Sequence, residues 1–312
     1  MVALISRSTV KRTARRQGQD VTGIIRIIRG WLGPTRALPP RIPDRVTYHQ
    51  VSTSAGVRGE WLNWNGPGEE RQDCCIYYLH GGGYFAGAPA THRNLTAALA
   101  ATARMRIFSL DYRLAPENPF PAAVEDAVAG YRWLLDQGYN PERMVIGGDS
   151  AGGGLSLATI LWLRDAGLPL PAGAFLLSPW TDLACTGNSL ETNDASDHML
   201  CAREVRRFSK VYYGEASPLD PLVSPLYANF DRFPPLCIYV SDTEVLFDDS
   251  IRLAERARHY GVDVDLRIRH NLIHAWPVMI NFRLPESRQV IEEVATFVHK
   301  QLPARSQVAA SA

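Results

Sequence analysis

A glycine-rich turn between a strand pattern and a helix pattern restricts the fold of this chain more than any other feature. The apolar run 144–146 predicts a buried strand, and the apolar spacing over 155–163 predicts a helix. Between them stands Gly148-Asp-Ser-Ala-Gly152, whose outer glycines remove the side chains that would collide in a tight turn. Such a turn lifts the hydroxyl of Ser150 clear of the sheet and aims the first amides of the helix at whatever that hydroxyl attacks. We interpret this stretch as a nucleophile elbow.

Strand patterns and helix patterns alternate along most of the chain. This order predicts a mostly parallel sheet with right-handed crossovers, which binds its ligands at the carboxyl ends of the strands. The strands expected first, 46–52 and 56–64, suit an antiparallel edge, whereas the run 74–80 is apolar on both faces and suits the middle of the sheet. The other expected strands are 105–111, 144–149, 174–178, 236–241 and 264–270, and the expected helices are 94–103, 122–137, 152–166, 249–260 and 286–301.

Two segments fall outside this alternation. Residues 184–233 separate two strand patterns, and with a helix expected over 199–213 they are interpreted as an inserted lid rather than as a bare loop. Near the N-terminus, the apolar residues between Val21 and Leu32 have helical spacing. That spacing fits a helix packed on the domain, part of a lid over a pocket, or a helix on a membrane surface.

Charge and cysteine usage exclude several classes of function. A net charge of +1 in 312 residues leaves no field that would attract nucleic acid, so nucleic acid is not expected as a partner. The five cysteines are odd in number and form no C-x-x-C pair, so we expect reduced, mostly buried thiols and neither a zinc site nor a disulfide framework. No apolar signal core and no membrane-length run is visible, which predicts a cytoplasmic protein without stable membrane insertion.

His80-Gly-Gly-Gly-Tyr84 lies where the third expected strand ends. A run of glycines costs chain entropy, but it lets backbone amides approach a ligand with no Cβ in the way. The amides of Gly82 and Gly83, with that of Ala151, are predicted to form an oxyanion hole for the negative oxygen of a tetrahedral intermediate. The alternative is a flexible glycine loop. His80 itself is expected to brace the loop through hydrogen bonds rather than to transfer protons.

A serine hydroxyl at its ordinary pKa is a poor nucleophile, so a base is required, and an elbow of this kind is followed along the chain by an acid and then a histidine. His274 lies in the loop just past the last expected strand, at the carboxyl edge of the sheet, and is predicted to be the base. His270 is the rival, although strand alternation gives it a structural role. The remaining histidines are interpreted as structural: His49, His92, His198, His259 and His299.

The acid is expected directly after the strand 236–241, where four carboxylates crowd into eight residues. One of them would fix the tautomer of the histidine and stabilise the imidazolium, and both Asp and Glu can do so. Asp248 and Asp249 precede the next helix and suit capping or dipole roles, which leaves Asp242 and Glu244.

Five motifs resemble, in this order, those of the hormone-sensitive-lipase-like carboxylesterases (bacterial family IV), over roughly residues 40–300. They are His80-Gly-Gly-Gly83, Asp111-Tyr-Arg-Leu-Ala-Pro-Glu117, Gly148-Asp-Ser-Ala-Gly152, Ser178-Pro-Trp-Thr-Asp182 and Asp220-Pro-Leu-Val-Ser-Pro225. The resemblance implies an α/β-hydrolase fold, with an eight-stranded, mostly parallel sheet flanked by helices and a helical cap. It also implies hydrolysis of carboxylic esters with short or medium acyl chains, without a cofactor or a metal.

The resemblance also bears on individual residues. The family's acid motif usually reads Asp-Pro-Leu-x-Asp, and the aligned stretch here is Glu244-Val-Leu-Phe-Asp248, so Glu244 is favoured as the acid and Asp242 is the alternate. Asp111, Arg113 and Glu117 resemble a structural ion-pair and turn segment that braces the oxyanion loop, and they are left out of the catalytic set.

The predicted function is therefore a serine carboxylesterase that uses Ser150, His274 and Glu244 on a small-molecule ester. An amidase or peptidase with the same triad and a non-catalytic small-molecule receptor on the same fold are the alternatives. Whether the protein forms a homodimer is left open. The expected division of the chain is an N-terminal part of the cap (1–42), a core in two parts (43–183 and 234–303), an inserted cap element (184–233) and a flexible tail (304–312).

Overall fold

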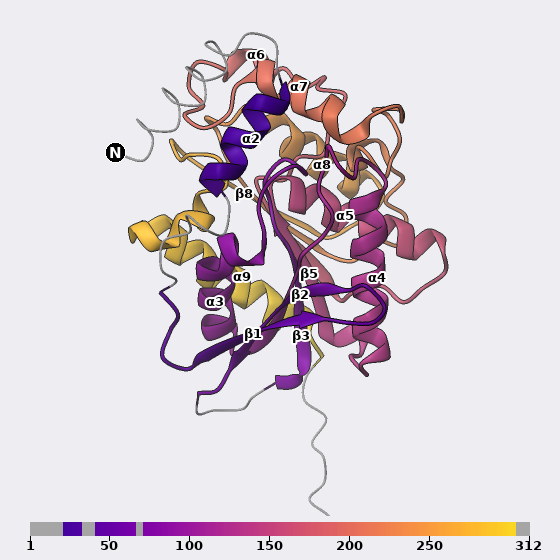
Figure 1. Ribbon diagram of the computed structural model, residues 1–312, viewed down its shortest axis with the longest axis vertical. Helices are drawn as coiled ribbons and strands as arrows, with labels where there is room; N and C mark the ends of the chain where they lie inside the picture. The colour runs from indigo at the N-terminus through magenta and orange to yellow at the C-terminus, as the bar shows by residue number, and fades with distance from the viewer. Residues whose placement is uncertain (1–20, 33–40, 67–70, 304–312) are drawn as a thin grey trace, which may run out of the picture.

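The computed structural model describes residues 21–32, 41–66 and 71–303, and a single eight-stranded sheet forms its centre (Figure 1). The strands follow the order β1-β2-β4-β3-β5-β6-β7-β8. Pairing is antiparallel between β1 and β2 and between β2 and β4, and parallel between all later neighbours. The predicted mostly parallel sheet with an antiparallel edge is thus confirmed. The strands are β1 (Val46–Ser52), β2 (Arg58–Trp64), β3 (Arg71–Leu79), β4 (Met105–Leu110), β5 (Met144–Asp149), β6 (Gly173–Leu177), β7 (Leu236–Ser241) and β8 (Val264–Arg269).

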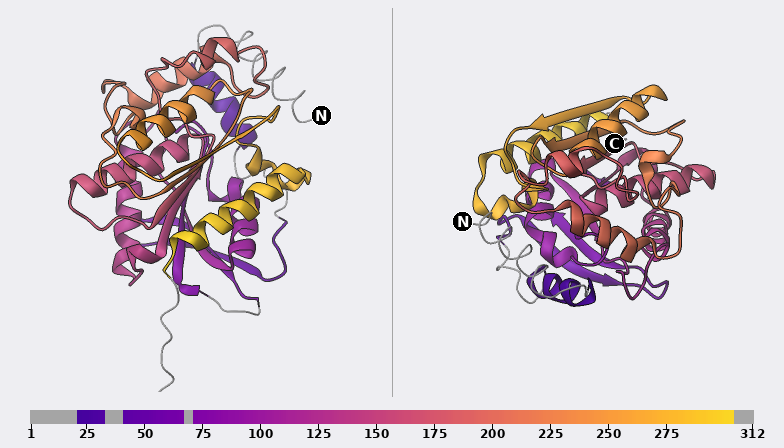
Figure 2. Two further views of the ribbon diagram at one scale, coloured as in Figure 1. Left: turned by 180° about the vertical axis from the view of Figure 1, so that it is seen from behind. Right: turned by 90° about the horizontal axis from the view of Figure 1, so that it is seen from above.

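Helices cover both faces of the sheet, which explains why its central strands are apolar on both sides. Every residue of β5, β6 and β7 is buried, whereas most of the edge strand β1 is exposed. One core cluster joins α3 (Pro89–Ala103) and α9 (Pro285–Gln301) to one face. The other cluster joins the opposite face to α4 (Ala122–Asp136), α5 (Ala151–Asp165) and α8 (Phe247–His259), as Figure 2 shows from behind. Short 3-10 turns are η1 (Pro141–Arg143), η2 (Pro225–Tyr227) and η3 (Trp276–Phe282).

Helix α3 differs from its expected start. The periodicity predicted a helix from residue 94, but α3 begins at Pro89. A proline at the first position of a helix loses no hydrogen bond, because the first amides have no intrahelical acceptor, and its fixed φ already suits a helix. The additional turn includes His92, whose position beside the elbow is described below.

The segments expected to form a cap lie together beyond the carboxyl ends of the parallel strands, at the upper end in Figure 1. They are α2 (Val21–Leu32), α6 (Ser189–Thr192) and α7 (Ala202–Tyr213). Ile24 and Ile25 of α2 are buried in the core cluster, so this apolar helix face packs on the protein itself. The predictions for residues 1–20, 33–40 and 304–312 lie outside the described residues. Within the described ranges, no helix combines the length and the apolar character that a membrane crossing requires.

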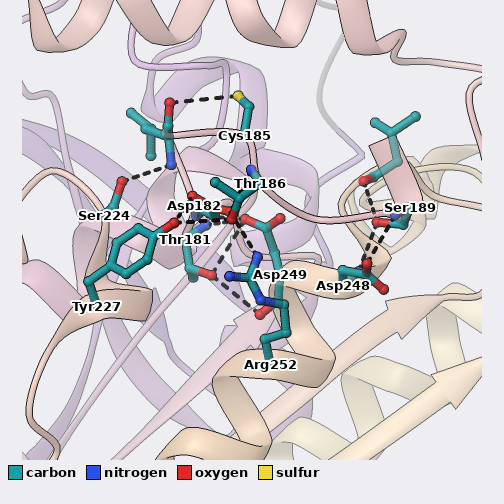
Figure 3. Close-up of polar contacts among 12 residues, drawn as sticks. Thr181, Asp182, Cys185, Thr186, Ser189, Ser224, Tyr227, Asp248, Asp249 and Arg252 are labelled. Atoms are coloured by element: carbon teal, nitrogen blue, oxygen red, sulfur yellow. Dashed lines mark hydrogen bonds and ion pairs between the residues drawn. The ribbon is translucent and has the colours of Figure 1, made fainter. Parts of the chain in front are cut away.

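A polar cluster fastens both ends of the inserted segment 184–233 to α8 (Figure 3). The carboxylate of Asp182 accepts hydrogen bonds from Thr186 Oγ1 at 2.6 Å and from Tyr227 OH at 2.9 Å, and it pairs with Arg252 Nη1 of α8 at 2.9 Å. Thr186 lies near the start of the insertion and Tyr227 near its end. One carboxylate therefore ties the two ends together and joins them to the core.

Asp248 and Asp249 were predicted to have capping or dipole roles at α8. The capping role is wrong, whereas both residues do lie in the first turn, which is the position that the dipole role requires. The helix begins at Phe247, which places both residues inside its first turn, where neither side chain caps it. Asp248 Oδ2 accepts the amide of Ser189 at 3.0 Å, and Asp249 Oδ2 accepts the amides of Thr181 and Asp182 at 2.7 and 2.8 Å (Figure 3). Both carboxyl groups thus bind the chain that leads into the insertion.

Replacing Asp249 by asparagine is expected to change how stability depends on pH. Burial, aided by the nearby Asp182 carboxylate, raises the pKa of Asp249 from 3.8 to about 8. The folded protein therefore holds a proton that the unfolded chain releases, and this contribution is complete below the unfolded pKa and is lost as pH rises from about 4 to about 8. The amide side chain of the D249N variant would keep an oxygen for both backbone amides and would not titrate.

Melting curves of wild type and D249N at pH 5, 6, 7 and 8 test this expectation. The free energy of unfolding of D249N, relative to wild type, should rise across the series by up to about 1.4 kcal/mol per pH unit. A difference that stays constant from pH 5 to pH 8 would contradict it.

Candidate active site

Ser150 occupies the turn between β5 and α5 in a backbone conformation that few side chains adopt. Its φ is 52° and its ψ is −121°, a strained region for any residue other than glycine. Its carbonyl accepts the amides of Gly153, Gly154 and Trp180, and its amide donates to Leu177 O at 2.8 Å. A Cβ on either Gly148 or Gly152 would collide with the carbonyl of Leu79 in the neighbouring strand β3. The two glycines thus let the elbow fold tightly against the sheet.

The structure brings Ser150, His274 and Glu244 into one chain of hydrogen bonds. His274 Nε2 lies 2.9 Å from Ser150 Oγ, and His274 Nδ1 lies 2.6 Å from Glu244 Oε2. A carboxylate can only accept, so Nδ1 carries a proton and Nε2 of the neutral ring is free to accept the serine proton. Glu244 is fully buried and His274 nearly so.

The two residues weighed as alternates pair with each other instead. The carboxylate of Asp242 lies 2.7 Å from His270 Nδ1 and accepts the amide of Asn271 at 3.0 Å. The His270 side chain is 77% exposed. The turn after β7 thus directs Asp242 to the surface and Glu244, two residues later, to His274.

Electrostatics at His274 favour the protonated ring. Burial alone would lower the pKa of His274, but the Glu244 carboxylate outweighs it, through its charge and its hydrogen bond, and raises that pKa above 6.5. An imidazolium formed during proton transfer is therefore stabilised in place.

The glycine loop after β3 leaves two backbone amides without acceptors. The φ angles of Gly82 and Gly83 are 120° and 64°, values that a larger residue rarely adopts. Gly82 O accepts the amides of Phe85 and Ala86, but within the described part of the chain no acceptor is recorded for the amides of Gly82 and Gly83. Ala151 is the first residue of α5, where a helix amide has no intrahelical partner. All three predicted donors are thus available to a ligand oxygen.

Asp149, the residue before the nucleophile, holds the start of the glycine loop through a hydrogen bond. Asp149 Oδ1 accepts the amide of Gly81 at 2.9 Å and the hydroxyl of Tyr78 at 2.6 Å, and its Oδ2 lies 3.3 Å from His92 Nε2. Burial opposes the Asp149 charge, but His92 and these hydrogen bonds lower the pKa of Asp149 to about 2, and Asp149 in turn raises the pKa of His92 against the effect of burial. His92, predicted to be structural, therefore pairs with a buried carboxylate next to the elbow. His80 contacts the loop as expected, with its Nδ1 at 2.8 Å from Gly81 O.

Ser178, at the end of β6, holds the far oxygen of Glu244 and was not among the predicted site residues. Its Oγ donates to Glu244 Oε1 at 2.7 Å and accepts the amide of Ala275 at 3.2 Å. The amide of Ser241 donates to the same Oε1 at 2.7 Å. The only signal in the sequence for a role of Ser178 was its position in the Ser178–Asp182 motif. Ser178 thus joins the acid to the residue that follows His274.

The inserted segment forms hydrogen bonds to the turn that carries Glu244. Asn193 Nδ2 donates to the carbonyls of Asp242 and Glu244, both at 2.9 Å, and Asp197 accepts the amide of Val245 at 2.9 Å. Periodicity cannot detect such contacts because they join polar side chains to backbone far away along the chain.

The segment 111–117 braces the glycine loop in a different way from the one expected. Asp111, Arg113 and Glu117 do not pair with one another, since each faces a partner elsewhere: Arg58 for Asp111, Asp126 for Arg113 and Arg29 for Glu117. The contacts to the loop come from backbone and from a tyrosine: the amide of Ala115 donates to Tyr84 O at 2.9 Å and Tyr112 OH donates to His80 O at 2.7 Å. Among the described residues, no group of three or more His, Cys, Asp or Glu side chains is placed to hold a metal ion.

Comparison with known proteins identifies the family of this chain. Residues 76–278 match the family described as having the alpha/beta hydrolase fold. The chain belongs to the hormone-sensitive-lipase-like esterases of that fold. It is 44% identical, over 82% of its length and 89% of the relative's, to an acetyl-hydrolase of Streptomyces hygroscopicus, and 36% identical, over 78% and 79%, to an esterase of Acinetobacter venetianus. A solved esterase from the bacterial hormone-sensitive lipase family is 39% identical with a TM-score of 0.85, and the match covers 97% of this chain and 99% of the other.

Removing the Ser178 hydroxyl is expected to impair catalysis without impairing substrate binding. S178A deprives Glu244 Oε1 of one of its two donors, so the carboxylate holds His274 less firmly. We expect kcat for p-nitrophenyl butyrate to fall by about tenfold and KM to change by less than about twofold. T159V is the matched control, because it removes another buried hydroxyl, which donates to Leu155 O in its own helix. Equal losses of kcat in both variants would show that the Ser178 hydroxyl has no specific role in holding Glu244.

Proposed function

We propose that this protein is a serine carboxylesterase that hydrolyses short- to medium-chain carboxylic esters through an acyl-enzyme on Ser150. The observation that carries the proposal is the continuous hydrogen-bond chain from Ser150 Oγ through His274 to Glu244, at 2.9 and 2.6 Å. Membership of a family whose relatives are named esterase and acetyl-hydrolase supports the same reaction. No feature of the site favours an amide substrate or a purely binding role.

Acylation begins when Ser150 Oγ attacks the ester carbonyl carbon and passes its proton to His274 Nε2. The ring becomes an imidazolium, which Glu244 stabilises through the Nδ1 hydrogen bond. The carbonyl oxygen becomes negative and accepts hydrogen bonds from the amides of Gly82, Gly83 and Ala151. When the tetrahedral intermediate collapses, His274 returns its proton to the leaving alcohol, and the acyl group remains on Ser150.

Deacylation repeats these steps with water. His274 Nε2 removes a proton from a water molecule, which attacks the acyl carbonyl, and the second tetrahedral intermediate uses the same amides. His274 then protonates Ser150 Oγ, and the carboxylic acid leaves. The residues end each cycle in their starting protonation states, so the reaction needs no cofactor.

Aromatic side chains pack against the glycine loop. The ring of Phe85 packs on Gly83, where any Cβ would meet it, and its centroid lies 4.4 Å from that of Phe208 on α7. Both rings are buried. The cytoplasmic location stays a prediction from the sequence, and whether the protein forms a homodimer stays open.

Replacing the nucleophile should abolish most activity. S150A is expected to lower kcat for p-nitrophenyl butyrate by roughly 10⁴-fold or more, because no other group near His274 Nε2 can form the acyl-enzyme. Its melting temperature should stay near that of wild type, since alanine preserves the elbow apart from one hydroxyl. Steady-state kinetics and a melting curve check both points, and turnover at the wild-type rate in a folded S150A protein would rule the proposal out.

Two carboxylate substitutions distinguish the acid from its neighbour. E244Q leaves a neutral group beside His274 Nδ1, so kcat should fall by roughly 10³- to 10⁴-fold. The residual activity should persist to lower pH, because the Glu244 charge is what raises the pKa of His274 and activity requires the neutral ring. D242N is the control and should keep kcat within about threefold, with an unchanged acidic limb of kcat/KM. The reverse pattern would make Asp242 the acid.

A further inference from the structure

The side chain of Arg29 connects helix α2 to the end of the glycine loop. Its Nε donates to the carbonyl of Phe85 at 2.6 Å, and its Nη2 donates to the carbonyl of Ala115 at 2.6 Å. The same guanidinium pairs with the carboxylate of Glu117 at 2.6 and 2.7 Å. One planar group therefore joins the N-terminal helix to the glycine loop and to the segment that follows β4.

The conformation of the loop depends on where its carbonyl groups point. Gly82 O accepts the amides of Phe85 and Ala86 at 3.2 and 2.9 Å, and Tyr84 O accepts the amide of Ala115 at 2.9 Å. Because each peptide unit is planar, a carbonyl held in place fixes the direction of the amide in the same unit. Arg29 holds the carbonyl of Phe85, whose peptide unit carries the amide of Ala86. That amide donates to Gly82 O, and the Gly82 carbonyl shares its own peptide unit with the amide of Gly83.

Packing from the cap adds to this restraint. Tyr84 stacks on Tyr212 of α7 with ring centroids 3.7 Å apart, and Phe85 packs on Phe208 of the same helix. Stacked rings resist separation but tolerate sliding, whereas a charged fork with two carbonyl acceptors fixes both distance and direction. Arg29 is therefore the contact that defines how the loop is oriented relative to the cap.

We propose that Arg29 is a positioning residue for the oxyanion hole, because it holds the carbonyl of Phe85 and so sets, through the Ala86 amide and Gly82 O, the direction of the Gly83 amide that would bind a negative oxygen. The inference rests on the proposed esterase function and extends it. It gives the N-terminal helix a part in stabilising the transition state, in addition to covering the site.

Four variants test the role of Arg29. R29A removes all of its contacts, and R29K keeps the charge and the alkyl chain but loses the planar fork. R26A is the matched control, since Arg26 is an exposed arginine one turn earlier on the same helix. E117Q removes the charged partner of Arg29 and leaves both backbone carbonyls in place.

Two measurements report on the oxyanion hole. The first is kcat and KM with p-nitrophenyl butyrate, and the second is the inhibition constant of n-butylboronic acid, whose tetrahedral adduct with a serine hydroxyl places an oxygen where the oxyanion forms. We expect R29A to lower kcat by about ten- to hundredfold and to weaken boronate inhibition by a similar factor, with KM within about twofold. R29K should be intermediate, and R26A and E117Q should stay within about threefold of wild type.

Several results would overturn the proposal. Folded R29A and R29K proteins with wild-type kcat and boronate inhibition would do so, and so would a change confined to KM, which would make α2 a wall of the pocket. An effect of E117Q as large as that of R29A would assign the role to the ion pair instead. If R29A fails to fold, R29K carries the test alone. An inactive wild type, or an active S150A, would instead contradict the esterase function itself.

Discussion

A carboxylate buried without any exposed surface is the constraint on which the rest of the site depends. Charge in the interior is tolerated only where hydrogen bonds replace water, and Glu244 has three donors: Ser178, the amide of Ser241 and His274. These donors come from three different strand ends. The parallel sheet brings those ends to one edge, so the fold and the electrostatics of the site are a single requirement.

The site is held from two sides that differ in chemistry. Beneath it, the core supplies a buried pair, Asp149 with His92, and the Asp149 carboxylate holds the start of the glycine loop. Above it, the inserted segment holds the turn of Glu244 through the side-chain amide of Asn193, the hydroxyl of Ser196 and the carboxylate of Asp197. Helix α2 contributes one guanidinium, which binds the carbonyl of Phe85 after the glycine loop. Backbone strain accumulates between the two, at Ser150, Ser178 and Ala275, all with positive φ. Surrounding contacts on both sides are what keep such conformations populated.

Features that depend on local pattern could be predicted from the sequence. The alternation of strands and helices predicted the sheet, and the glycines around Ser150 predicted the elbow, because period and turn chemistry act within a few residues. The choice between Asp242 and Glu244 needed the family resemblance, since both follow the same strand and the direction of each side chain is set by one turn. Ser178, Asn193 and the pair of Asp149 with His92 could not be found. Their roles arise from contacts between residues distant in sequence. The sequence pattern around a buried histidine is the same whether or not the folded chain places a carboxylate beside it.

The cluster around Asp182 has a consequence for exchanging parts between related enzymes. Segments that shape a pocket are natural candidates for grafting, and residues 184–233 look at first like a detachable module. Yet Arg252 and Asp249, which hold the Asp182 that joins its two ends, lie on a helix well downstream, and the side chain of Asn193 holds the turn of the acid. A chimera in which that insertion alone is exchanged would lose these contacts to the helix and to the turn of the acid. It would therefore disturb the acid and the histidine, although only the segment above the site had been replaced.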